Sequence, residues 1–421
     1  VQDFPVTILD VDDASIAEIG QWPWPRTRFA ELVDKAHADG AVAIAFDIIF
    51  AEPDRLSPSR IADDNPDLSP AILEALRAQP ESDTVLAAAI ARGTVVVGQT
   101  SVRSALAEEM FEAEVPPVPH ALIGPDPGLF IMTLPELVQN LPVLEEAAAG
   151  RGIFSTRPDA DGVYRRLPMV ANAGGQLRLG LSLELLRIGT GGEPFVVRTN
   201  DAGIDGVVLA RNQFQTAGDG TVRPYLTPSQ KSRFVSIADL LTGRMPEGRL
   251  NGHLVLVGTS AIGLGDYRAT PLGVQMPGVE IHAQLLEGVL SGQLLSRPNY
   301  AIAVEVVTAV TICLILVILT PIMNAVALIA SSLMFLVTCG VVTFLFFQTN
   351  QVLLDPSFPI LAGLLTIIFM STANYLREEQ RRREIRNAFR QYVSADLVNV
   401  LTENREKLQL GGETRELTLL F

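Results

Sequence analysis

Three long apolar runs near the C-terminal end constrain this chain more than any other feature. Residues 301–320 contain one charged residue, Glu305, and residues 322–347 and 356–376 contain none. A helix needs about 20 consecutive apolar residues to cross the hydrocarbon core of a bilayer. The alternative, three buried helices of a large soluble protein, fits three adjacent runs of this length poorly. The sequence therefore predicts three transmembrane helices in a lipid bilayer, at about residues 300–320, 322–347 and 356–376.

The residues that flank these runs predict the direction in which the chain crosses the membrane. Arginines follow the third run at positions Arg377, Arg381, Arg382, Arg383, Arg386 and Arg390, whereas the connections between the runs have no Lys or Arg. Positive residues gather on the cytoplasmic side, so we expect residues 1–297 outside a cell (inner) membrane and the C-terminus in the cytoplasm. Because Val1 to Asp10 show no signal peptide, we also expect an anchor helix ahead of Val1.

Composition excludes several classes of function. Nearly all of the net charge of −15 belongs to residues 1–297, and an acidic domain is a poor partner for nucleic acid, which is bound through Lys and Arg. The two cysteines, Cys313 and Cys339, lie in the apolar runs, and the histidines lack metal-ligand spacing; we therefore predict no metal site in this chain. Glu305 and Asp355 fall near the predicted outer surface, so the runs lack the buried charges typical of a transporter or channel.

The first 297 residues alternate between strand-like and helix-like patterns. The predicted strands are residues 6–12, 41–50, 94–100 and 253–260, and the predicted helices are residues 26–38, 71–91, 179–188 and 279–290. The nearly continuous apolar run at 41–50 indicates a strand covered on both faces. Residues 190–235 favour short antiparallel strands, and residues 57–70 and 112–127 favour loops. The predicted fold is an α/β domain with a mixed or parallel sheet.

Three segments in this region carry a family resemblance. The first contains Ile8-Leu-Asp-Val-Asp-Asp-Ala-Ser15, Gly20-Gln-Trp-Pro-Trp-Pro-Arg26 and Ala45-Phe-Asp-Ile-Ile-Phe-Ala-Glu-Pro53; the second is Asp161-Gly-Val-Tyr-Arg-Arg-Leu-Pro168; the third contains His253-Leu-Val-Leu-Val-Gly-Thr-Ser260, Thr270-Pro271 and Met276-Pro-Gly-Val-Glu-Ile-His-Ala283. The order of these segments and their residues resemble the type-two CHASE sensor, an extracellular input domain attached to nucleotide cyclases, histidine kinases and Ser/Thr kinases. The resemblance covers nearly all of residues 1–297. It implies an extracellular ligand or protein partner, which the sequence does not identify.

The candidate ligand-binding residues are Trp22, Trp24, Arg26 and Asp47. The two indoles and the guanidinium could line a pocket, although a stiff turn into a helix, with both rings packed on the sheet, is the favoured interpretation. Asp47 could join Asp10, Asp12 and Asp13 in a carboxylate cluster at strand ends, suited to a cation or polar ligand.

For that cluster too, the structural interpretation is favoured: solvated or helix-capping carboxylates. For Asp159, Asp161 and Gly162, a tight turn is similarly favoured over a calcium loop. His282, on the last predicted helix, is interpreted as a packed or surface residue rather than a ligand.

A cytoplasmic helix is predicted to continue from the third apolar run. Ile385, Phe389 and Tyr392 form a short apolar stripe at spacings of four and three, the pattern of a paired helix. Ser394 could cap a second helix with Leu397 on its apolar face. Residues 377–410 are therefore predicted to be coupling helices of a homodimer, and their arginines also suit an anionic membrane surface.

The last residues carry a second resemblance. Phe389-Arg-Gln-Tyr-Val-Ser394, residues 404–408, Gly411-Gly-Glu413 and Arg415-Glu-Leu-Thr-Leu-Leu-Phe421 resemble the lead-in to class III adenylate or guanylate cyclase domains, with Ala395 where many members have Pro. The resemblance implies that residues 411–421 are the first strand of a cyclase domain. Its metal-binding aspartates, with their Mg or Mn ions and ATP, are expected beyond Phe421, so we expect this chain by itself to be inactive.

The predicted function is the receptor part of a membrane-bound class III cyclase, most often an adenylate cyclase that forms cyclic AMP and pyrophosphate from ATP. The choice of ATP over GTP rests only on the commoner activity in that family. A receptor with a kinase output is the first alternative, although no histidine follows His282 to serve as a phosphoacceptor. A non-catalytic membrane scaffold is the second.

Overall fold

The computed structural model describes residues 5–101, 118–128, 130–134, 137–173, 175–298, 300–323, 325–390 and 418. The chain divides into two compact units. The first comprises Val1–Asn299 with Phe347–Leu353, and the second comprises Tyr300–Phe346 with Leu354–Phe421.

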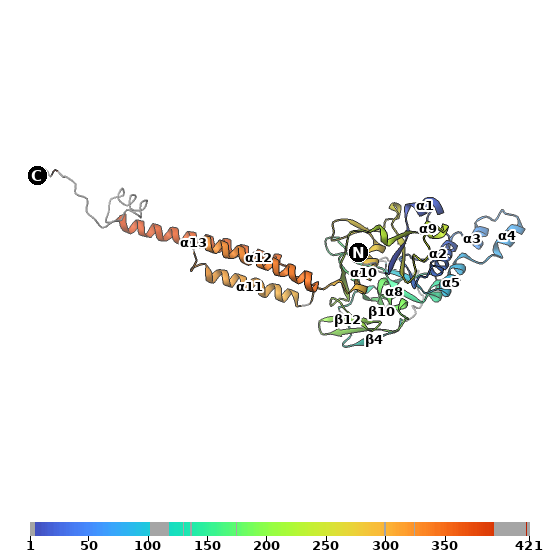
Figure 1. Ribbon diagram of the computed structural model, residues 1–421, viewed down its shortest axis with the longest axis horizontal. Helices are drawn as coiled ribbons and strands as arrows, with labels where there is room; N and C mark the ends of the chain where they lie inside the picture. The colour runs from blue at the N-terminus through green and yellow to red at the C-terminus, as the bar shows by residue number, and fades with distance from the viewer. Residues whose placement is uncertain are drawn as a thin grey trace. The chain divides into compact units, whose positions relative to one another are not determined.

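A sheet of seven strands forms the centre of the first unit (Figure 1). In chain order these strands are β1 (Val6–Val11), β2 (Ala43–Phe46), β3 (Val95–Ser101), β6 (Leu137–Val138), β7 (Gly150–Ile153), β15 (Phe234–Ser236) and β16 (Leu254–Thr259). Their order across the sheet is β15-β1-β16-β2-β3, and β3 pairs with both β7 and β6. All pairs are parallel except β3–β6, which confirms the expected mixed sheet.

Helices cover both faces of this sheet. One face carries α2 (Arg26–Ala38), α5 (Ser82–Arg92), α7 (Pro142–Ala147) and α9 (Ile237–Thr242); the other carries α8 (Leu181–Gly189) and α10 (Gly278–Ser291). Successive strand residues point to opposite faces, so Ile8 joins the core beneath α8 and α10, whereas Leu9 joins the core beneath α2. Both faces are therefore apolar, which explains the unbroken hydrophobic runs in the sequence.

Smaller sheets surround the central one. Strands β11 (Phe195–Asn200), β12 (Gly203–Leu209) and β13 (Asn212–Gln215) are antiparallel, which confirms the expectation for residues 190–235. Strand β4 (His120–Ile123) runs parallel to β11 and corrects part of the expected loop at 112–127. The other short strands are β5 (Thr133–Leu134), β8 (Leu167–Pro168), β9 (Val170–Ala173), β10 (Gln176–Leu179), β14 (Thr221–Pro224), β17 (Tyr267–Ala269), β18 (Gln275–Pro277) and β19 (Leu294–Leu295).

Two helix predictions need correction. The helix expected at 71–91 is split into α4 (Pro70–Arg77) and α5, because Pro80 disfavours helical backbone in the residue before it and lacks an N–H. The loop expected at 57–70 contains α3 (Pro58–Asp64), which begins at a proline, a residue suited to the first helical turn. Helices α3 and α4 project from the first unit (Figure 1). A short helix, α1 (Asp13–Ile19), follows β1.

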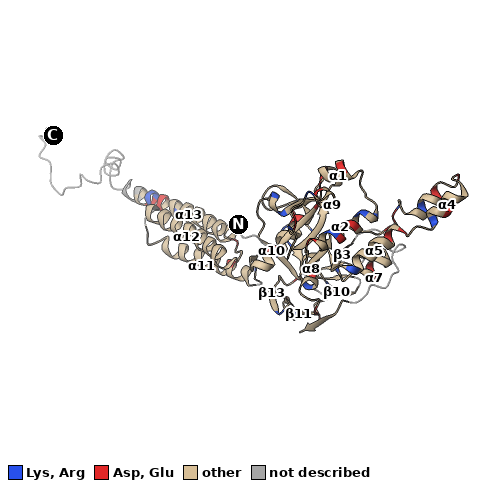
Figure 2. Cartoon of the chain, turned by 45° about the vertical axis from the view of Figure 1, so that its right-hand side comes forward, with Lys and Arg blue, Asp and Glu red and all other residues tan. Residues whose placement is uncertain are grey.

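The second unit contains three long helices, α11 (Ala301–Leu319), α12 (Ala325–Asn350) and α13 (Ser357–Arg390). Within the described residues, these are the helices long and apolar enough to cross a membrane. They are almost free of charge except at the C-terminal end of α13 (Figure 2). Apolar side chains such as Val307, Leu333 and Phe369 are more than half exposed, as lipid-facing residues are. Helix α13 continues without a break beyond the third apolar run.

Candidate functional site

A cavity of about 320 Å³ opens where β2, β3, β7 and β16 end at the same edge of the parallel sheet. We call it the carboxyl-edge cavity. Ligands of open α/β sheets bind outside the carboxyl ends of the strands, so its position alone marks it as a candidate site. The first turns of α10 form part of the same wall through Gly278, Ile281 and His282.

Asp47 lines this cavity directly after β2. Its backbone N–H donates to the carbonyl of Val257 on β16 (2.8 Å), which fixes the residue beside the neighbouring strand. Burial first, and then the negative charge of Asp266, raise the pKa of the Asp47 carboxyl to about 8, against the opposing effect of Arg268. A carboxyl group that holds its proton near neutral pH, inside a cavity, is a candidate functional group.

An ion pair forms the opposite part of the cavity. Nη2 of Arg268 lies 2.8 Å from Oδ1 of Asp266, and the guanidinium lies over the ring of Tyr164, 5.4 Å from its centroid. Gly278 allows this arrangement, because a Cβ there would lie 2.5 Å from Oδ2 of Asp266. Burial raises the pKa of Asp266, and Arg268 opposes that effect.

The remaining polar groups of the cavity are uncharged near neutral pH. His282 is 5% exposed, and its burial lowers the pKa to about 4. Its Nδ1 lies 3.2 Å from Oγ of Ser182 on α8. Hydroxyl groups line the strand ends: Thr100 and Ser155 are 2.8 Å apart between their side-chain oxygens, and Thr156 and Thr259 lie on the same wall. The cavity therefore offers many hydrogen-bonding groups and few charges.

The three sequence segments that carry the resemblance meet at this cavity. Asp47 comes from the first segment, Tyr164 and Leu167 from the second, and Thr259 and His282 from the third. Segments that are far apart in the chain are thus brought to one place by the ends of parallel strands and by α10. This convergence makes the carboxyl-edge cavity the first candidate for ligand binding.

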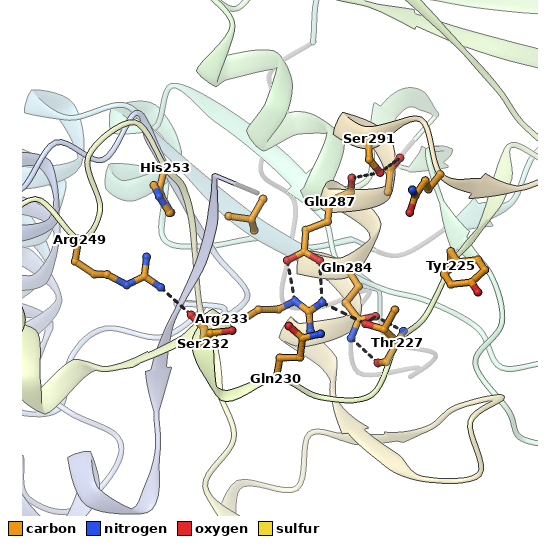
Figure 3. A pocket seen from close by; sticks show the side chains of 13 residues that line it. Tyr225, Thr227, Gln230, Ser232, Arg233, Arg249, His253, Gln284, Glu287 and Ser291 are labelled. Atoms are coloured by element: carbon orange, nitrogen blue, oxygen red, sulfur yellow. Dashed lines mark hydrogen bonds and ion pairs between the residues drawn. The ribbon is translucent and has the colours of Figure 1, made fainter. Parts of the chain in front are cut away.

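A second cavity, of about 490 Å³, lies at the opposite edge of the sheet, where β1 and β16 begin (Figure 3). We call it the amino-edge cavity. Val6 and His253 line it at the strand starts, Ser232 and Arg233 line it just before β15, and the C-terminal half of α10 lines it with residues that include Glu287 and Ser291.

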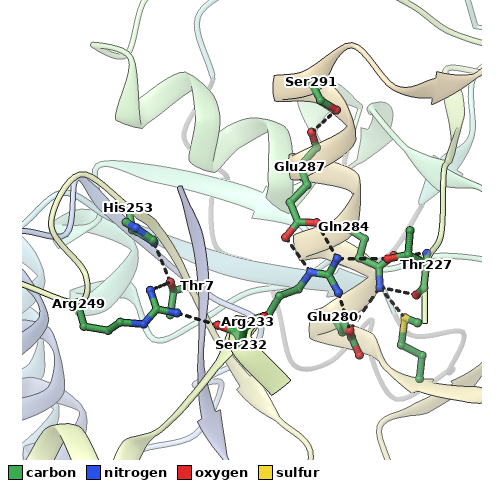
Figure 4. A network of polar contacts seen from close by, with 11 residues as sticks. Thr7, Thr227, Ser232, Arg233, Arg249, His253, Glu280, Gln284, Glu287 and Ser291 are labelled. Carbon is green, nitrogen blue, oxygen red and sulfur yellow. Dashed lines mark hydrogen bonds and ion pairs between the residues drawn. The ribbon is translucent and has the colours of Figure 1, made fainter. Parts of the chain in front are cut away.

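An ion network joins the walls of the amino-edge cavity (Figure 4). Nε of Arg233 lies 2.7 Å from Oε1 of Glu287, and Nη1 lies 3.2 Å from Oε1 of Glu280. Glu280 has no exposed surface, and within the part of the chain that the structure describes its Oε2 has no hydrogen-bond partner. Gln284 pairs with the backbone of Thr227, accepting from its N–H (2.7 Å) and donating to its carbonyl (3.0 Å). One guanidinium thus balances two carboxylates of α10.

A second polar group lies on the other side of β1 in the same view. Arg249 donates to the carbonyl of Ser232 (2.7 Å) and to Oγ1 of Thr7 (3.3 Å). The same Thr7 oxygen lies 2.8 Å from Nδ1 of His253. These bonds connect the starts of β1, β15 and β16.

Helix α10 contributes to both cavities. Its first turns line the carboxyl-edge cavity and its last turns line the amino-edge cavity. A helix of 14 residues is about 21 Å long, so α10 spans the sheet from one edge to the other. It ends at Ser291, and the first apolar helix begins at Ala301.

The predicted aromatic and arginine candidates occupy another part of the first unit. Trp22 and Trp24 pack edge to face with centroids 5.3 Å apart, and both lie against Phe29 of α2. Trp24 is 2% exposed, and its Nε1 donates to the carbonyl of Gly20 (2.8 Å). Arg26 pairs with Asp83 (3.3 Å). None of the three predicted residues lines either cavity, and these contacts agree with the favoured packing interpretation.

The predicted carboxylate cluster is divided among different roles. Asp12 caps α1 by accepting from the N–H of Ser15 (2.8 Å), and Asp13 is exposed in the first turn of that helix. Asp10 is buried and accepts from the hydroxyl of Ser260; burial raises its pKa to about 6. Asp47 alone of the four lines a cavity. Within the described residues no group of three or more metal-ligating side chains gathers.

The turn at residues 159–162 is held by ion pairs. Asp159 and Asp161 pair with Arg166 and Arg165 at 2.7 Å each, and the N–H of Gly162 donates to the carbonyl of Asp159 (2.9 Å). Both carboxylates are thus paired with arginines, which agrees with the interpretation of this segment as a tight turn.

The predicted coupling residues are placed only in part. Ile385 is exposed on α13. The backbone of Phe389 belongs to the same helix, but its side chain lies outside what the structure describes, as do Tyr392, Leu397 and the whole of the predicted second coupling helix.

Several cavity residues were not predicted as ligand-binding. Asp266, Arg268 and Tyr164 come from loops or short strands, where no periodicity distinguishes a cavity residue from a surface residue. The signal in the sequence was the position of a residue relative to a strand. Asp47 directly follows a buried strand and Thr259 ends one. His282 lies in the first turns of a helix that follows a strand. Glu280 and Arg233 had no such signal, because only the folded chain brings them together.

Comparisons with known proteins give one match. A family model described as the CHASE2 domain matches residues 1–322. No curated protein and no solved structure matches this chain. The match extends beyond the expected domain end at residue 297 and includes the first apolar helix, α11.

Proposed function

This chain belongs to the CHASE2 domain family and is a signalling receptor with membrane helices, and we propose that its output is a class III nucleotide cyclase. The residues that carry this proposal are Phe389-Arg-Gln-Tyr-Val-Ser394 and Arg415-Glu-Leu-Thr-Leu-Leu-Phe421, which read as the lead-in to such a domain. The expected reaction is the conversion of ATP to cyclic AMP and pyrophosphate. Mg or Mn ions, bound by aspartates beyond Phe421, would activate the ribose hydroxyl for attack on the α-phosphate.

The arginines after the third span support an orientation. They lie in the C-terminal part of α13, where the helix is charged (Figure 2). With these residues in the cytoplasm and three crossings before them, the first unit lies outside the cell membrane. The sensor would then meet an extracellular signal, and the cyclase would meet cytoplasmic ATP.

Helix α10 is the proposed link between signal and membrane. A ligand in the carboxyl-edge cavity would contact its first turns, and the ion network of Arg233 holds its last turns. Only about ten residues separate the end of α10 from the start of α11. A shift of α10 would therefore reach the first span along a short stretch of chain. A coupling of about 1–3 kcal/mol, typical of allosteric proteins, would change activity about 5- to 150-fold.

The receptor is proposed to act as a homodimer, because class III cyclases build their active sites between two domains. Ile385 and Phe389 would face their counterparts across the dimer. Cysteine cross-linking tests this after Cys313 and Cys339 have been replaced by serine. Ile385→Cys should form a disulfide-linked dimer in membranes, whereas Asn387→Cys, about 200° away around the helix, should cross-link far less. Equal or absent cross-linking at both positions would contradict the paired helix.

Nucleotide turnover by the longer natural chain in membranes is the decisive experiment. ATP and GTP are compared in Mg²⁺ and in Mn²⁺, with the chain ending at Phe421 as the matched control. Cyclic AMP from ATP, lost in the control, is the expected result. Cyclic GMP from GTP would show that the substrate is GTP and would still support a cyclase output.

No cyclic nucleotide under any condition would favour one of the two other outputs. Protein phosphorylation with ATP would identify a receptor with a kinase output. The absence of both activities would identify a membrane scaffold, whose extracellular unit binds a partner without a catalytic consequence.

A further inference from the structure

We propose that the carboxyl-edge cavity binds a small hydroxylated ammonium ion, of the size of an amino alcohol or an amino sugar, and that Asp47 receives its positive charge. The claim that this ion is the receptor's signal rests on the proposed function above. The claim that the ion binds in the cavity does not depend on that function.

The charges of the cavity are not balanced. Its wall carries two carboxyl groups, Asp47 and Asp266, and one guanidinium, Arg268. Asp266 is paired with that guanidinium at 2.8 Å. Among the described residues no hydrogen bond or ion pair joins the carboxyl group of Asp47 to a cation. Asp47 is partly buried, and a carboxylate withdrawn from water without a cation is costly, so the cavity has a place for one positive charge beside Asp47.

A proton fills this place when no ligand is bound. Burial, assisted by the charge of Asp266, raises the pKa of Asp47 to about 8, so the carboxyl group is mostly protonated at neutral pH. An ammonium group would replace that proton, and its N–H donors would form charge-assisted bonds to both carboxylate oxygens. Binding would therefore release about one proton from Asp47.

The uncharged lining indicates the rest of the ligand. Hydroxyl groups of Thr100, Ser155, Thr156 and Thr259 line the cavity. Thr100 and Ser155 bond each other and Thr156 donates to the carbonyl of Arg166, so these hydroxyls offer mainly acceptor lone pairs to the hydroxyl and ammonium donors of a ligand. His282 is neutral above about pH 4 and adds a ring nitrogen. Hydroxyl groups of a ligand match such a surface better than methyl groups do. A volume of about 320 Å³ is at the small end of ligand cavities, which suits an amino sugar.

Other ligand classes fit this lining less well. An anion would have to share the one guanidinium, Arg268, with Asp266 and would lie beside two carboxyl groups. A calcium ion takes six to eight oxygen ligands, and the described residues contain no cluster of three metal-ligating side chains.

The test uses the chain in lipid nanodiscs and four probes. Glucosamine and ethanolamine supply the ammonium group, and glucose and ethylene glycol are their neutral counterparts. Binding is measured by isothermal titration calorimetry and by the shift in unfolding temperature. The two amines should bind and stabilise the chain, and the neutral compounds should do so at least about tenfold more weakly.

Two variants locate the charge. Asp47→Asn keeps the shape of the protonated carboxyl and should weaken amine binding about 10- to 100-fold. Asp205→Asn, at an exposed position on β12 outside the cavity, removes the same formal charge and should leave binding unchanged. If Asp47→Asn does not fold, the comparison of amines with neutral probes in the unchanged chain still tests the proposal.

The pH dependence of binding gives a further readout. Ethanolamine should bind about tenfold more tightly per pH unit between pH 5.5 and 7.5 and level off near pH 8, as Asp47 loses its proton. The titratable and charged groups that line the cavity with Asp47 are Asp266, Arg268, Tyr164 and His282, and the pKa of His282, about 4, lies below this pH range. The slope should be absent in Asp47→Asn.

Three results would overturn the proposal: glucose binding as tightly as glucosamine, calcium or magnesium ions stabilising the chain where amines do not, or unchanged amine binding in Asp47→Asn. The outcome is independent of the cyclase assay. Amine binding that depends on Asp47, without any cyclic nucleotide, would keep this site and reject the cyclase output. Cyclase activity without amine binding would keep the cyclase output and reject this ligand site.

Discussion

The guanidinium of Arg233 lies 2.7 Å from the carboxylate of Glu287, and this ion pair holds the last turns of α10 to the segment that precedes β15. Both side chains are largely buried. Glu280, about two helical turns earlier on α10, accepts from the same guanidinium at 3.2 Å. One arginine therefore holds α10 at two places: in its first turn through Glu280, and near the end that leads to the first span through Glu287.

Replacing Glu287 by Gln should loosen this end of α10. Arg233 would keep Glu280 but lose its second charged partner, which we expect to cost about 1–3 kcal/mol in the free energy of unfolding. Amide hydrogen exchange should increase in the last turns of α10 before other helices are affected. Both quantities can be measured on the whole chain in nanodiscs. Glu193→Gln, at an exposed position, is the matched control; equal effects of the two substitutions would show that the ion pair contributes little.

Asp47 should make the first unit less stable as the pH rises. Its folded pKa of about 8 lies above the ordinary value of 3.8, so the folded state retains a proton that the unfolded state loses. Stability then falls by up to about 1.4 kcal/mol per pH unit between about pH 4 and 8. His282, whose folded pKa is lowered to about 4, opposes this trend below about pH 6.5, and Asp10 adds to it below about pH 6.

The window between pH 7 and 8 therefore isolates Asp47. Urea unfolding at several pH values should show a decline in the wild-type chain and a flatter profile in Asp47→Asn. Asp205→Asn should retain the wild-type slope. A decline of the same size in Asp47→Asn would assign the titration to another group.

Trp24 should contribute to stability and not to ligand binding. Its indole is buried against Trp22 and Phe29, and its N–H is bonded to the carbonyl of Gly20. Trp24→Ala should cost about 3–5 kcal/mol, as buried aromatic truncations do, and Trp24→Phe about 1 kcal/mol through the lost hydrogen bond. Calorimetry with ethanolamine should give the same affinity for Trp24→Phe as for the unchanged chain. A large loss of affinity with little loss of stability would return the aromatic pair to the list of ligand-binding residues.

The central sheet could be predicted from the sequence because its strands are buried on both faces. The run at 41–50 and the run at 253–260 are apolar without alternation, and β2 and β16 lie within them. Periodicity also placed α2 and α10 within about one residue of their observed bounds. The helix predictions failed at prolines. Pro80 divides one predicted helix, and Pro58 begins a helix that was not predicted.

The cavities were predictable only where a strand end is visible in the sequence. Asp47 was among the predicted residues as a member of the carboxylate cluster expected at strand ends, and it directly follows β2. Arg268 was not, because its partners Asp266 and Tyr164 meet it through a turn and a distant loop. Trp22 and Trp24 showed the opposite problem. Large rings beside an arginine suit either a pocket or a packed turn, the packed turn was the favoured interpretation, and the packing of the rings agrees with it.

Glu305 should fasten the first apolar helix to the segment that precedes α13. Its Oε1 accepts from the backbone N–H of Asp355 (2.7 Å), and the residue is 8% exposed. A backbone N–H near hydrocarbon is costly to leave unpaired, so Glu305→Leu should destabilise the second unit by about 1–3 kcal/mol. Glu305→Gln keeps an acceptor oxygen and should cost less. Val307→Leu, at an exposed apolar position, should be neutral. Unfolding of the whole chain in mixed micelles of rising SDS content measures all three, and a Glu305→Leu chain as stable as the wild type would show that this carboxylate does not hold the segment.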